Sequence, residues 1–409
     1  MNKVIFHIDV NSAFLSWEAV DRLKKASSLS ASDEVIDLRD IPSAVGGDIN
    51  RRHGVILAKS FPAKQYGIRT GEPTVSALKK CPNLTIVPPN HKLYEECSEA
   101  FVKILEEYSP CIEKVSVDEA FCDMTGTEEL FGPPLQAANT IKDRIFKELG
   151  FTVNIGISTN KLLAKMASDF TKPNRVHTLY PSEIKEKMWG LPVGELFFVG
   201  KATVNKLHTL GIYTIGQLAN TDVNILKSHL KKHGEMIYNF ANGIDSSLIS
   251  NDEVKNKGYG NSTTIAFDVE DEATAKTVLL SLAENVSARL RKDGQMANVV
   301  AVGIVDNNFR RTTHQKTLLS PTHNTNDIYN VVCQLFDNLW EGEPIRKLEI
   351  QTSKVISEDE EKQLDIFSFQ NDLKKKKLDK AIDQIRNRFG NDAIQRASLL
   401  HGETTDKKG

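Results

Sequence analysis

The sequence has few cysteines, no long apolar run and almost no net charge. None of its cysteines pairs as CxxC, which argues against a zinc knuckle or a disulfide framework; they are Cys81, Cys97, Cys111, Cys122 and Cys333. Free thiols at this density fit a reducing cytoplasm. No run of about 18 apolar residues is present, so we expect no membrane span. The apolar stretch 4–9 is too short for the hydrophobic region of a signal peptide, and we expect a cytoplasmic protein.

The charge of the chain is balanced. Its 409 residues include 52 basic and 54 acidic side chains, which give a formal net charge of −2. This length predicts two or three domains at about 150 residues per domain. The apolar content of 40% and the charged content of 26% exclude wholesale disorder. Because nucleic-acid-binding domains are usually basic, the whole-chain charge by itself disfavours a nucleic-acid partner.

Two parts of the chain have the same predicted order of elements, β-α-β-β-α-β, which is typical of ferredoxin-like domains. In the first part, with 26–108 set aside as an insertion, the elements are 4–9, 11–25, 112–118, 120–125, 134–149 and 152–158. In the second part they are 262–268, 274–293, 298–306, 309–318, 326–340 and 346–354. The patterns therefore predict an α+β protein of several domains.

The segments between and beyond these two parts differ in composition. Residues 26–90 are interrupted by Gly and Pro and are expected to be irregular. A helix is expected to begin near residue 91. A helix from about residue 160 has Ser158 or Thr159 available as its N-cap. The polar stretch 246–260 indicates a linker. A basic helix near 376–389 is expected to stop at Gly390.

Three carboxylates are placed to meet in the first part. Asp9 ends the first strand, and Asp118 and Glu119 lie between two short strands. Strands one and three are neighbours in a ferredoxin-like sheet, so these side chains can share one sheet edge. Carboxylates at such short distances repel each other unless a cation neutralises them. Oxygen ligands select Mg²⁺ or Mn²⁺, and a pair of these ions suits phosphoryl transfer. The alternative is that they are ordinary turn acids.

Basic residues lie near this acidic cluster in the sequence. The segment 51–70 carries five bases and no acid, whereas 111–130 carries six acids and one base. An acidic metal site beside a basic segment is what a polyphosphate substrate with Mg²⁺ requires. Lys172, just before Pro173, is a second basic candidate. Its alternative role is a lysine that interacts with the dipole at a helix C-terminus.

Several stretches of the sequence resemble motifs of the Y-family translesion DNA polymerases, in the branch of bacterial DNA polymerase IV and UmuC. They are 7–14 (HIDVNSAF), 116–121 (SVDEAF), 156–165 (GISTNKLLAK) and 172–174 (KPN). The resemblance runs from residue 3 to about residue 367. It implies a ferredoxin-like palm with small fingers, a helical thumb with a helix-hairpin-helix, and a βαββαβ little finger domain. The implied boundaries are palm 1–25 and 88–175, fingers 26–87, thumb 176–245, linker 246–260, little finger 261–354 and tail 355–409.

The resemblance also implies catalytic roles for particular residues. Asp9, Asp118 and Glu119 match the family's metal-binding carboxylates, and the backbone carbonyl of Val10 matches an auxiliary ligand. The implied cofactor is a pair of Mg²⁺ ions, with Mn²⁺ as the alternative. Lys172 matches the lysine that contacts the triphosphate.

The implied nucleotide site departs from the family pattern at some positions. Phe14 matches the aromatic steric gate that would clash with a ribose 2′-OH; from its pattern alone it would be a core aromatic on an amphipathic helix. Where relatives commonly have Tyr-Glu-Ala-Arg, this chain has Phe61 to Lys64, which loses a hydroxyl and a bidentate guanidinium. Asn11 replaces a frequent second Asp. These changes put the efficiency of nucleotide use in question.

Two regions match DNA-contacting parts of the family. The stretch 199–203 resembles a helix-hairpin-helix, in which Gly200 and Lys201 would hold a phosphate, although Phe198 stands where a glycine is usual. A plain helix connection closed by Gly200 is the alternative. In the little finger, Arg310 and Arg311 match phosphate-contacting residues on a proposed strand that also carries His314 and Lys316. Alternation along a strand prevents all of these from touching DNA, and a charged, solvated edge strand is the alternative.

Residues 363–367 (QLDIF) resemble the short bacterial peptide that binds the sliding clamp. Gln363 would form hydrogen bonds to the clamp backbone, and Leu364, Ile366 and Phe367 would fill apolar pockets. The functional prediction is a template-directed, error-prone translesion DNA polymerase that uses primer–template DNA and deoxynucleoside triphosphates. We expect it to be monomeric and to contact no membrane. A non-enzymatic, clamp-tethered DNA-binding factor is the second hypothesis. A nucleotidyl cyclase on a similar palm is disfavoured by the helix-hairpin-helix and the clamp-like peptide.

Overall fold

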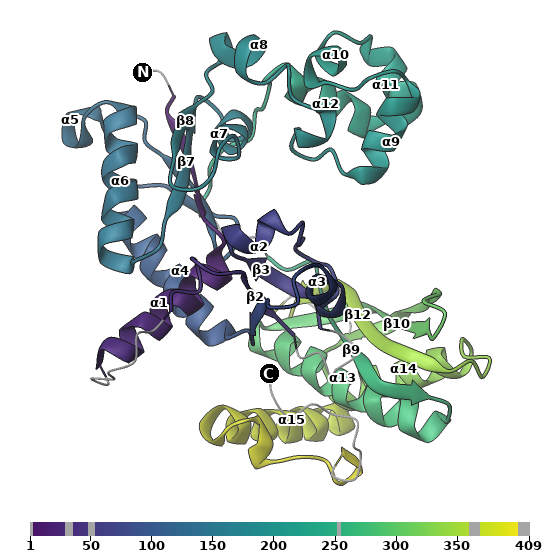
Figure 1. Cartoon of the computed structure of the whole chain (residues 1–409). Coiled ribbons are helices and arrows are strands. Elements are labelled where there is room, and N and C mark those ends of the chain that lie inside the picture. Colours follow the sequence, from purple (N-terminus) through teal and green to yellow (C-terminus); the bar gives the residue numbers. More distant parts are fainter. Residues whose placement is uncertain (1–2, 29–35, 48–53, 252–254, 360–368, 400–409) are drawn as a thin grey trace. The chain divides into compact units, whose positions relative to one another are not determined.

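The computed structural model describes residues 3–28, 36–47, 54–251, 255–359 and 369–399. The described residues divide into two compact units, one formed by those up to residue 251 and the other by those from residue 255 onward (Figure 1). Within the described residues, no helix is long and apolar enough to cross a membrane. The five cysteines are free thiols.

The first unit is built on a five-stranded sheet in the order β5-β6-β1-β7-β8. Its strands are β1 (Ile5–Val10), β5 (Ile112–Lys114), β6 (Glu119–Asp123), β7 (Val153–Ser158) and β8 (Val176–Thr178). Strand β1 is antiparallel to both β6 and β7. The predicted ferredoxin-like palm is therefore confirmed, with the first and third strands of the β-α-β-β-α-β series side by side.

The two faces of this sheet have different neighbours. Phe6, Ile8 and Val10 join the main core, which includes residues of α1 (Ala13–Ser28), α4 (His91–Glu106) and α6 (Pro134–Leu149). The alternate residues His7 and Asp9 contact α7 (Lys161–Ser168) on the other face. Period-two alternation along β1 thus separates the apolar core from the polar side chains.

Helix α7 lies very close to the sheet at Gly156. A Cβ atom at this position would overlap the carbonyl oxygen of Ala164 and lie 2.5 Å from the backbone nitrogen of Ser168. Glycine at residue 156 therefore allows α7 to cross β7 at backbone contact distance. The helix begins after Asn160, whose side chain accepts a hydrogen bond from the Leu163 N–H at 2.9 Å. The predicted N-caps, Ser158 and Thr159, were wrong.

The expectation of irregular structure over 26–90 was also wrong. A three-stranded sheet in the order β3-β2-β4 forms there from β2 (Ser43–Gly46), β3 (Ile56–Lys59) and β4 (Thr85–Val87). It packs with α2 (Phe61–Gln65) and α3 (Thr74–Lys80) around a small core of Ala44, Ile56, Ala63, Ile68 and Ala77. Strands of three or four residues are too short to show a hydrophobic period, so the glycines and prolines dominated the pattern.

A helical module follows the palm, as the sequence predicted. It contains α8 (Ile184–Lys187), α9 (Lys201–Thr209), α10 (Ile215–Ala219), α11 (Val223–Leu230) and α12 (Lys232–Ala241). In Figure 1, α9 to α12 gather in one group. Leu162, Leu163 and Met166 of α7 belong to the same core cluster as these helices. The helix that positions part of the palm therefore also anchors this module.

The second unit contains a four-stranded sheet in the order β11-β10-β12-β9. Its elements are β9 (Gly258–Val269), α13 (Glu272–Lys292), β10 (Gln295–Asp306), β11 (Arg311–Thr322), α14 (Thr325–Asp337) and β12 (Ile345–Ser357). The predicted element order is confirmed, but the strand order is not that of the palm. The fourth strand, rather than the third, pairs with the first, so β9 forms an edge of the sheet.

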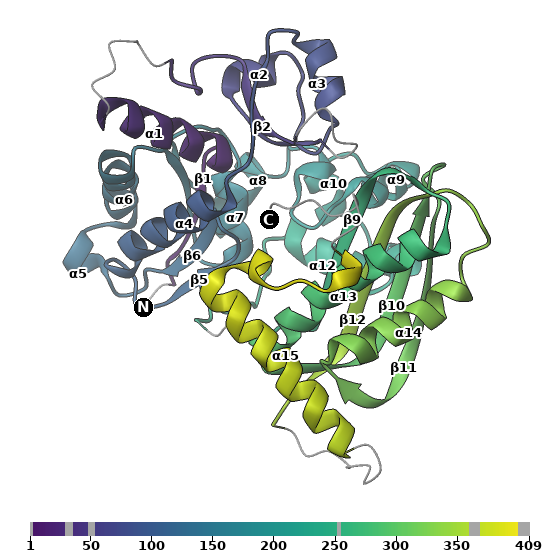
Figure 2. The same cartoon turned by 90° about the horizontal axis from the view of Figure 1, so that it is seen from below.

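Part of the segment predicted as a tail is bonded to the little finger helices. Helix α15 (Phe369–Phe389) starts seven residues before the predicted helix. It ends directly before Gly390, as predicted, and this glycine has φ 93°. Arg291 of α13 forms a bidentate pair with Asp383, at 2.6 and 2.9 Å. Glu284 of the same helix pairs with Arg386 and Arg396 at 3.1 and 2.8 Å. Figure 2 shows α15 beside α13. The predicted peptide 363–367 lies outside the described residues.

Candidate active site

A pocket of about 390 Å³ in the first unit brings together most of the predicted catalytic and nucleotide-binding residues. Its walls come from the end of β1 and the start of α1, from the end of β3 with α2, and from the turn before β6. Among its lining residues are Asp9, Val10, Phe14, Phe61, Lys64, Asp118 and Lys172. The segments that meet here are far apart in the sequence.

The three predicted carboxylates lie at one end of β1 and β6. Asp9 is directly opposite Glu119 in the antiparallel register. The Val10 N–H donates to the Asp118 carbonyl at 3.0 Å, which continues the pairing by one step. The Asp118 carboxylate accepts a hydrogen bond from the Ser116 hydroxyl at 2.6 Å. Glu119 does not line the pocket, although it is the cross-strand neighbour of Asp9.

Two lysines form ion pairs with acids of this cluster. Lys165 Nζ lies 2.6 Å from Glu119 Oε1 and 3.8 Å from Asp9 Oδ2. Lys172 Nζ lies 2.8 Å from Asp9 Oδ1 and 2.9 Å from Asp169 Oδ1. The sequence reasoning did not assign Lys165 or Asp169 to the site. Lys165 ends the motif 156–165, and Asp169, the residue directly after α7, lies four positions further on; this spacing was the available signal.

Burial changes the protonation of this cluster. Burial raises the pKa of Asp9 to about 7, although Lys172 and Lys165 act in the opposite direction and Glu119 adds to the rise. Burial, with Lys165 and Lys172, holds the pKa of His7 well below its ordinary value, so this imidazole is neutral. His7 Nδ1 lies 2.8 Å from the Ser168 hydroxyl. Its Nε2 faces Glu119 at 4.0 Å and has no hydrogen-bond partner among the described residues.

The donor set suits a hard divalent cation. Asp9, Asp118 and Glu119 offer carboxylate oxygens, which Mg²⁺ prefers. Among the described residues, no three His, Cys, Asp or Glu side chains already converge as a metal cage. Lys165 and Lys172 supply the compensating positive charge that partly buried carboxylates need. The chemistry of the residues present therefore fits the cation, and in this structure the two lysines provide the counter-charges of the acids.

The ring of Phe14 is supported from behind. It stacks on Tyr94 with ring centroids 4.2 Å apart and an interplanar angle of 8°. Tyr94 is fully buried and donates its hydroxyl proton to Glu18 Oε1 at 2.8 Å. Trp17 packs beside both rings. Phe14 thus lines the pocket with a ring that is fixed by stacking at the border of the palm core.

Asn11 belongs to a hydrogen-bond network that requires an amide. Its Nδ2 donates to Asn154 Oδ1 at 3.2 Å, and its Oδ1 accepts from the Thr152 hydroxyl at 3.0 Å and the Asn174 N–H at 2.9 Å. An aspartate could accept these bonds but could not donate to Asn154. This network gives a physical reason for an asparagine where relatives often have a second Asp.

The predicted helix-hairpin-helix contains an unusual backbone. Phe198 has φ 67°, which lies in the left-handed region that favours glycine. Phenylalanine therefore stands in place of the usual glycine at a position whose backbone conformation favours glycine. Its side chain is exposed and lies against Phe197, with ring centroids 4.3 Å apart. Gly200 is the N-cap of α9, and Lys201, its first residue, is exposed. The contact of these residues with a phosphate stays a prediction.

On the little finger sheet, alternation divides the predicted basic strand as expected. His314 and Lys316 are opposite the core residues Val302 and Val300, and Lys316 bonds to Gln334 of α14. These two side chains therefore lie on the helix-covered face. Arg311 lies on the other face of the sheet.

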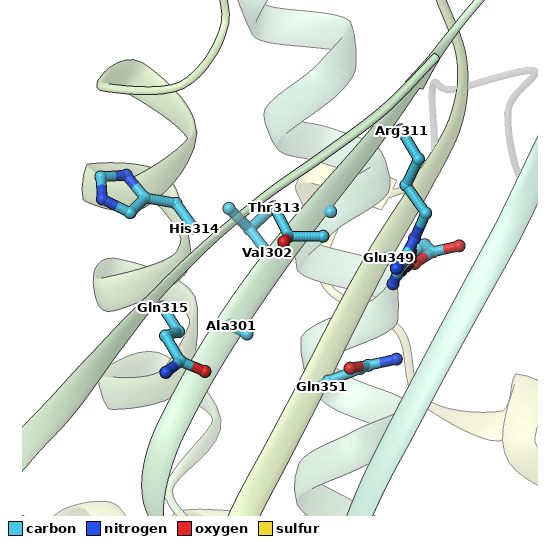
Figure 3. Close-up of a pocket in the computed structure, with 9 residues that line it drawn as sticks. Ala301, Val302, Arg311, Thr313, His314, Gln315, Glu349 and Gln351 are labelled. Atoms are coloured by element: carbon cyan, nitrogen blue, oxygen red, sulfur yellow. Dashed lines mark hydrogen bonds and ion pairs between the residues drawn. The ribbon is translucent and has the colours of Figure 1, made fainter. Parts of the chain in front are cut away.

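The open face of this sheet contains a cavity of about 350 Å³ (Figure 3). Ala301 and Gly303 of β10 are among its lining residues, and Arg311 and Glu349 point toward each other across it. The Arg311 guanidinium is 2.7 Å from Glu349 Oε2, and Lys347 lies 2.8 Å from Oε1 of the same carboxylate. Arg311 therefore already has a carboxylate partner. Arg310 is exposed in the turn before β11.

Comparison with known proteins agrees with this architecture. Family models match three stretches: the impB/mucB/samB family at residues 8–169, its C-terminal domain at 256–366, and the DNA polymerase-iota thumb domain at 195–245. A solved Y-family DNA polymerase chimera, Dbh-Dpo4(243-245)-Dbh, has the same fold with a TM-score of 0.73 at 20% identity. The match covers 87% of this chain and 99% of the chimera.

Curated relatives match over nearly the full chain. "DNA polymerase IV" of Clostridium acetobutylicum is 47% identical over 404 residues, covering 98% of this chain and 100% of the relative. "DNA polymerase IV 1" of Bacillus subtilis is 36% identical over 410 residues, covering 100% and 96%. The chain belongs to the impB/mucB/samB family, the Y family of translesion DNA polymerases.

We predict that Asn11→Asp destabilises the palm. The new carboxylate would face Asn154 Oδ1, and Asn154 cannot turn its amide around without losing the bonds from its Nδ2 to the Ser168 and Thr171 carbonyls. The expected loss is about 1–3 kcal/mol in the free energy of unfolding, measured by denaturant titration. Asn139→Asp, on the exposed side of α6, is the control and should change stability by less than about 0.5 kcal/mol. Equal stability of Asn11→Asp and the unmodified protein would contradict the role of the network.

Proposed function

We propose that this protein is a template-directed DNA polymerase of the error-prone translesion type, which extends a primer during bypass and repair of DNA damage. The observation that carries this conclusion is the pocket shared by Asp9, Asp118, Phe14 and Lys172. Relatives of the same length carry the name DNA polymerase IV. Its substrates are primer–template DNA and deoxynucleoside triphosphates.

We assign the carboxylates of Asp9, Asp118 and Glu119, with the carbonyl of Val10, to two Mg²⁺ ions, and Mn²⁺ is the alternative. When bound, such a pair activates the primer 3′-OH and stabilises charge on the departing pyrophosphate. The contribution of the lysines is electrostatic. Lys165 and Lys172 oppose the effect of burial on Asp9, which favours its ionised form.

The remaining pocket residues have roles in nucleotide binding. Lys172 and Lys64 provide positive charge for the triphosphate, and Phe61 packs beside it without a hydroxyl to donate. Phe14, fixed by its stack on Tyr94, excludes a ribose 2′-OH by contact with its ring edge. Discrimination between deoxynucleotides and ribonucleotides then depends on the shape of the pocket rather than on its charge.

We also propose the wider organisation that the family resemblance implies. Palm, fingers, thumb, linker and little finger keep the boundaries given above, and Gly200, Lys201, Arg310 and Arg311 track DNA phosphates. Because Arg311 is partly neutralised by Glu349, its share of that binding is small. The peptide 363–367 attaches a monomeric polymerase to the sliding clamp and raises its effective concentration at the primer end.

We predict that Asp118→Ala lowers primer extension at least about a hundredfold, because it removes a carboxylate from the acidic cluster on which the reaction depends. The assay is gel-based extension of a primed template with Mg²⁺ and all four deoxynucleotides. Glu129→Ala, on the exposed helix α5 (Glu128–Phe131), is the matched control and should extend normally. A complete absence of extension by the unmodified protein would instead support the non-enzymatic, clamp-tethered binding factor.

We predict that Phe14→Ala reduces the preference for deoxynucleotides over ribonucleotides at least about tenfold, because the ring edge no longer excludes the 2′-OH. Single-nucleotide incorporation with matched dNTP and rNTP measures this ratio. Phe146→Ala, at an exposed position of α6, should keep the preference of the unmodified protein. Unchanged discrimination by Phe14→Ala would refute the steric gate.

We predict that deletion of residues 363–367 abolishes stimulation by the clamp and leaves extension without clamp unchanged. Extension is measured on a long primed template with and without the clamp loaded. Asp365→Ala changes a peptide residue that was not assigned to a pocket or a backbone bond, and it should retain stimulation. Retained stimulation in the deletion would exclude this peptide as the clamp anchor.

A further inference from the structure

The pocket contains a lysine that neither the sequence reasoning nor the family motif assigns. Lys59 is the last residue of β3, pairs with Ala44 in the register of the fingers sheet, and lines the pocket together with Lys64 and Thr70. Its ammonium donates to the Thr70 hydroxyl at 3.2 Å. It lies outside the stretch 61–64 in which the family's Tyr and Arg are replaced.

The charge on Lys59 is not neutralised by an acid. No carboxylate lies within 4.0 Å of Lys59 or Lys64 in the described part of the chain, whereas Lys172 is shared between Asp9 and Asp169. Glu72, whose charge acts on Lys59, forms its ion pair with Lys80 at 2.5 Å. Burial and the positive charge of Lys64 lower the pKa of Lys59, and the charge of Glu72 acts in the opposite direction. An unpaired cationic pair is unfavourable unless an anion joins it.

The chemistry of the pocket identifies that anion. Lys59 and Lys64 line the same pocket as Asp9, Asp118 and Lys172. A polyanion whose one end is held at the acidic cluster through a cation can therefore reach these two ammonium groups with its other charges. Phe61 cannot donate a hydrogen bond to it, and Lys64 offers one point charge where a guanidinium would make two parallel bonds. A second ammonium beside Lys64 replaces what these two changes remove.

We infer that Lys59 contacts the triphosphate of the incoming nucleotide and shares with Lys64 the binding that relatives obtain from a tyrosine and an arginine. This inference rests on the proposed polymerase function. Thr70 holds the ammonium in place when no nucleotide is bound. Lys59 is a binding residue and takes no part in the bond changes, so its loss should affect KM more than kcat.

The test uses full-length Lys59→Gln and Lys59→Arg in single-nucleotide incorporation. Glutamine keeps a donor for Thr70 but has no charge, and it should raise KM for the dNTP about tenfold with kcat within about twofold. Arginine keeps the charge and should stay within about threefold of the unmodified KM. Lys79→Gln, an exposed lysine of α3 outside the pocket, is the matched control and should leave KM unchanged.

A binding measurement separates the triphosphate from other ligands. The polymerase is bound to a primer–template whose primer ends in a dideoxynucleotide, so that no chemistry follows, and is titrated with either the correct dNTP or the corresponding dNMP. Lys59→Gln should weaken dNTP binding about tenfold and dNMP binding less than about twofold. Equal weakening of both would overturn the triphosphate assignment.

The remaining outcomes are also decisive. Weaker binding of primer–template with unchanged dNTP affinity would reassign Lys59 to the DNA backbone. Unchanged affinity for both ligands would make it an ordinary surface lysine, and either result overturns the inference while the unmodified protein still extends primers. Failure of the proposed function is distinct, because the unmodified protein would then neither extend a primer nor bind a dNTP.

Discussion

The site depends on the close contact between helix α7 and the palm sheet. The missing side chain at Gly156 lets α7 rest on β7, and this places Lys165 beside Glu119 and brings the following chain, with Lys172, to Asp9. The same helix gives four residues to the core of the helical module. One backbone contact therefore aligns the acidic cluster with its counter-charges and supports the thumb-like helices. A bulkier residue there would move all of these together.

The local distribution of charge, rather than the net charge of the chain, determines how the protein contacts phosphate groups. Acids on the palm side of the pocket and unpaired lysines on the fingers side cancel in the net charge of −2. The little finger shows the same balance over a shorter distance, because Glu349 offsets Arg311 and Lys347. Such a protein has little long-range attraction for DNA, so its affinity rests on short-range contacts and falls with salt. A tether to another protein then becomes useful.

The departures from the family pattern have separate physical explanations. Asn11 is retained by a network in which its amide both donates and accepts. Phe198 occupies a left-handed position that costs a non-glycine residue of order 1 kcal/mol, and its exposed ring lies beside the start of α9. Where the family has Arg, this chain has Lys64. A second lysine, Lys59, lies five residues earlier in the sequence and lines the same pocket. None of these changes removes an oxygen donor of the acidic cluster.

The sequence pattern alone predicted the β-α-β-β-α-β element order of both units, the alternation that divides Arg311 from His314, and the meeting of Asp9 with Asp118 and Glu119. These follow from hydrophobic period and from the adjacency of strands in a known topology, which are local or nearly local properties. The small fingers sheet, the strand order of the little finger and the positions of Lys165, Asp169 and Lys59 at the site became evident only in the tertiary structure. Short strands carry no readable period, and a lysine's partners depend on segments up to 163 residues away, as the pairing of Lys172 with Asp9 illustrates.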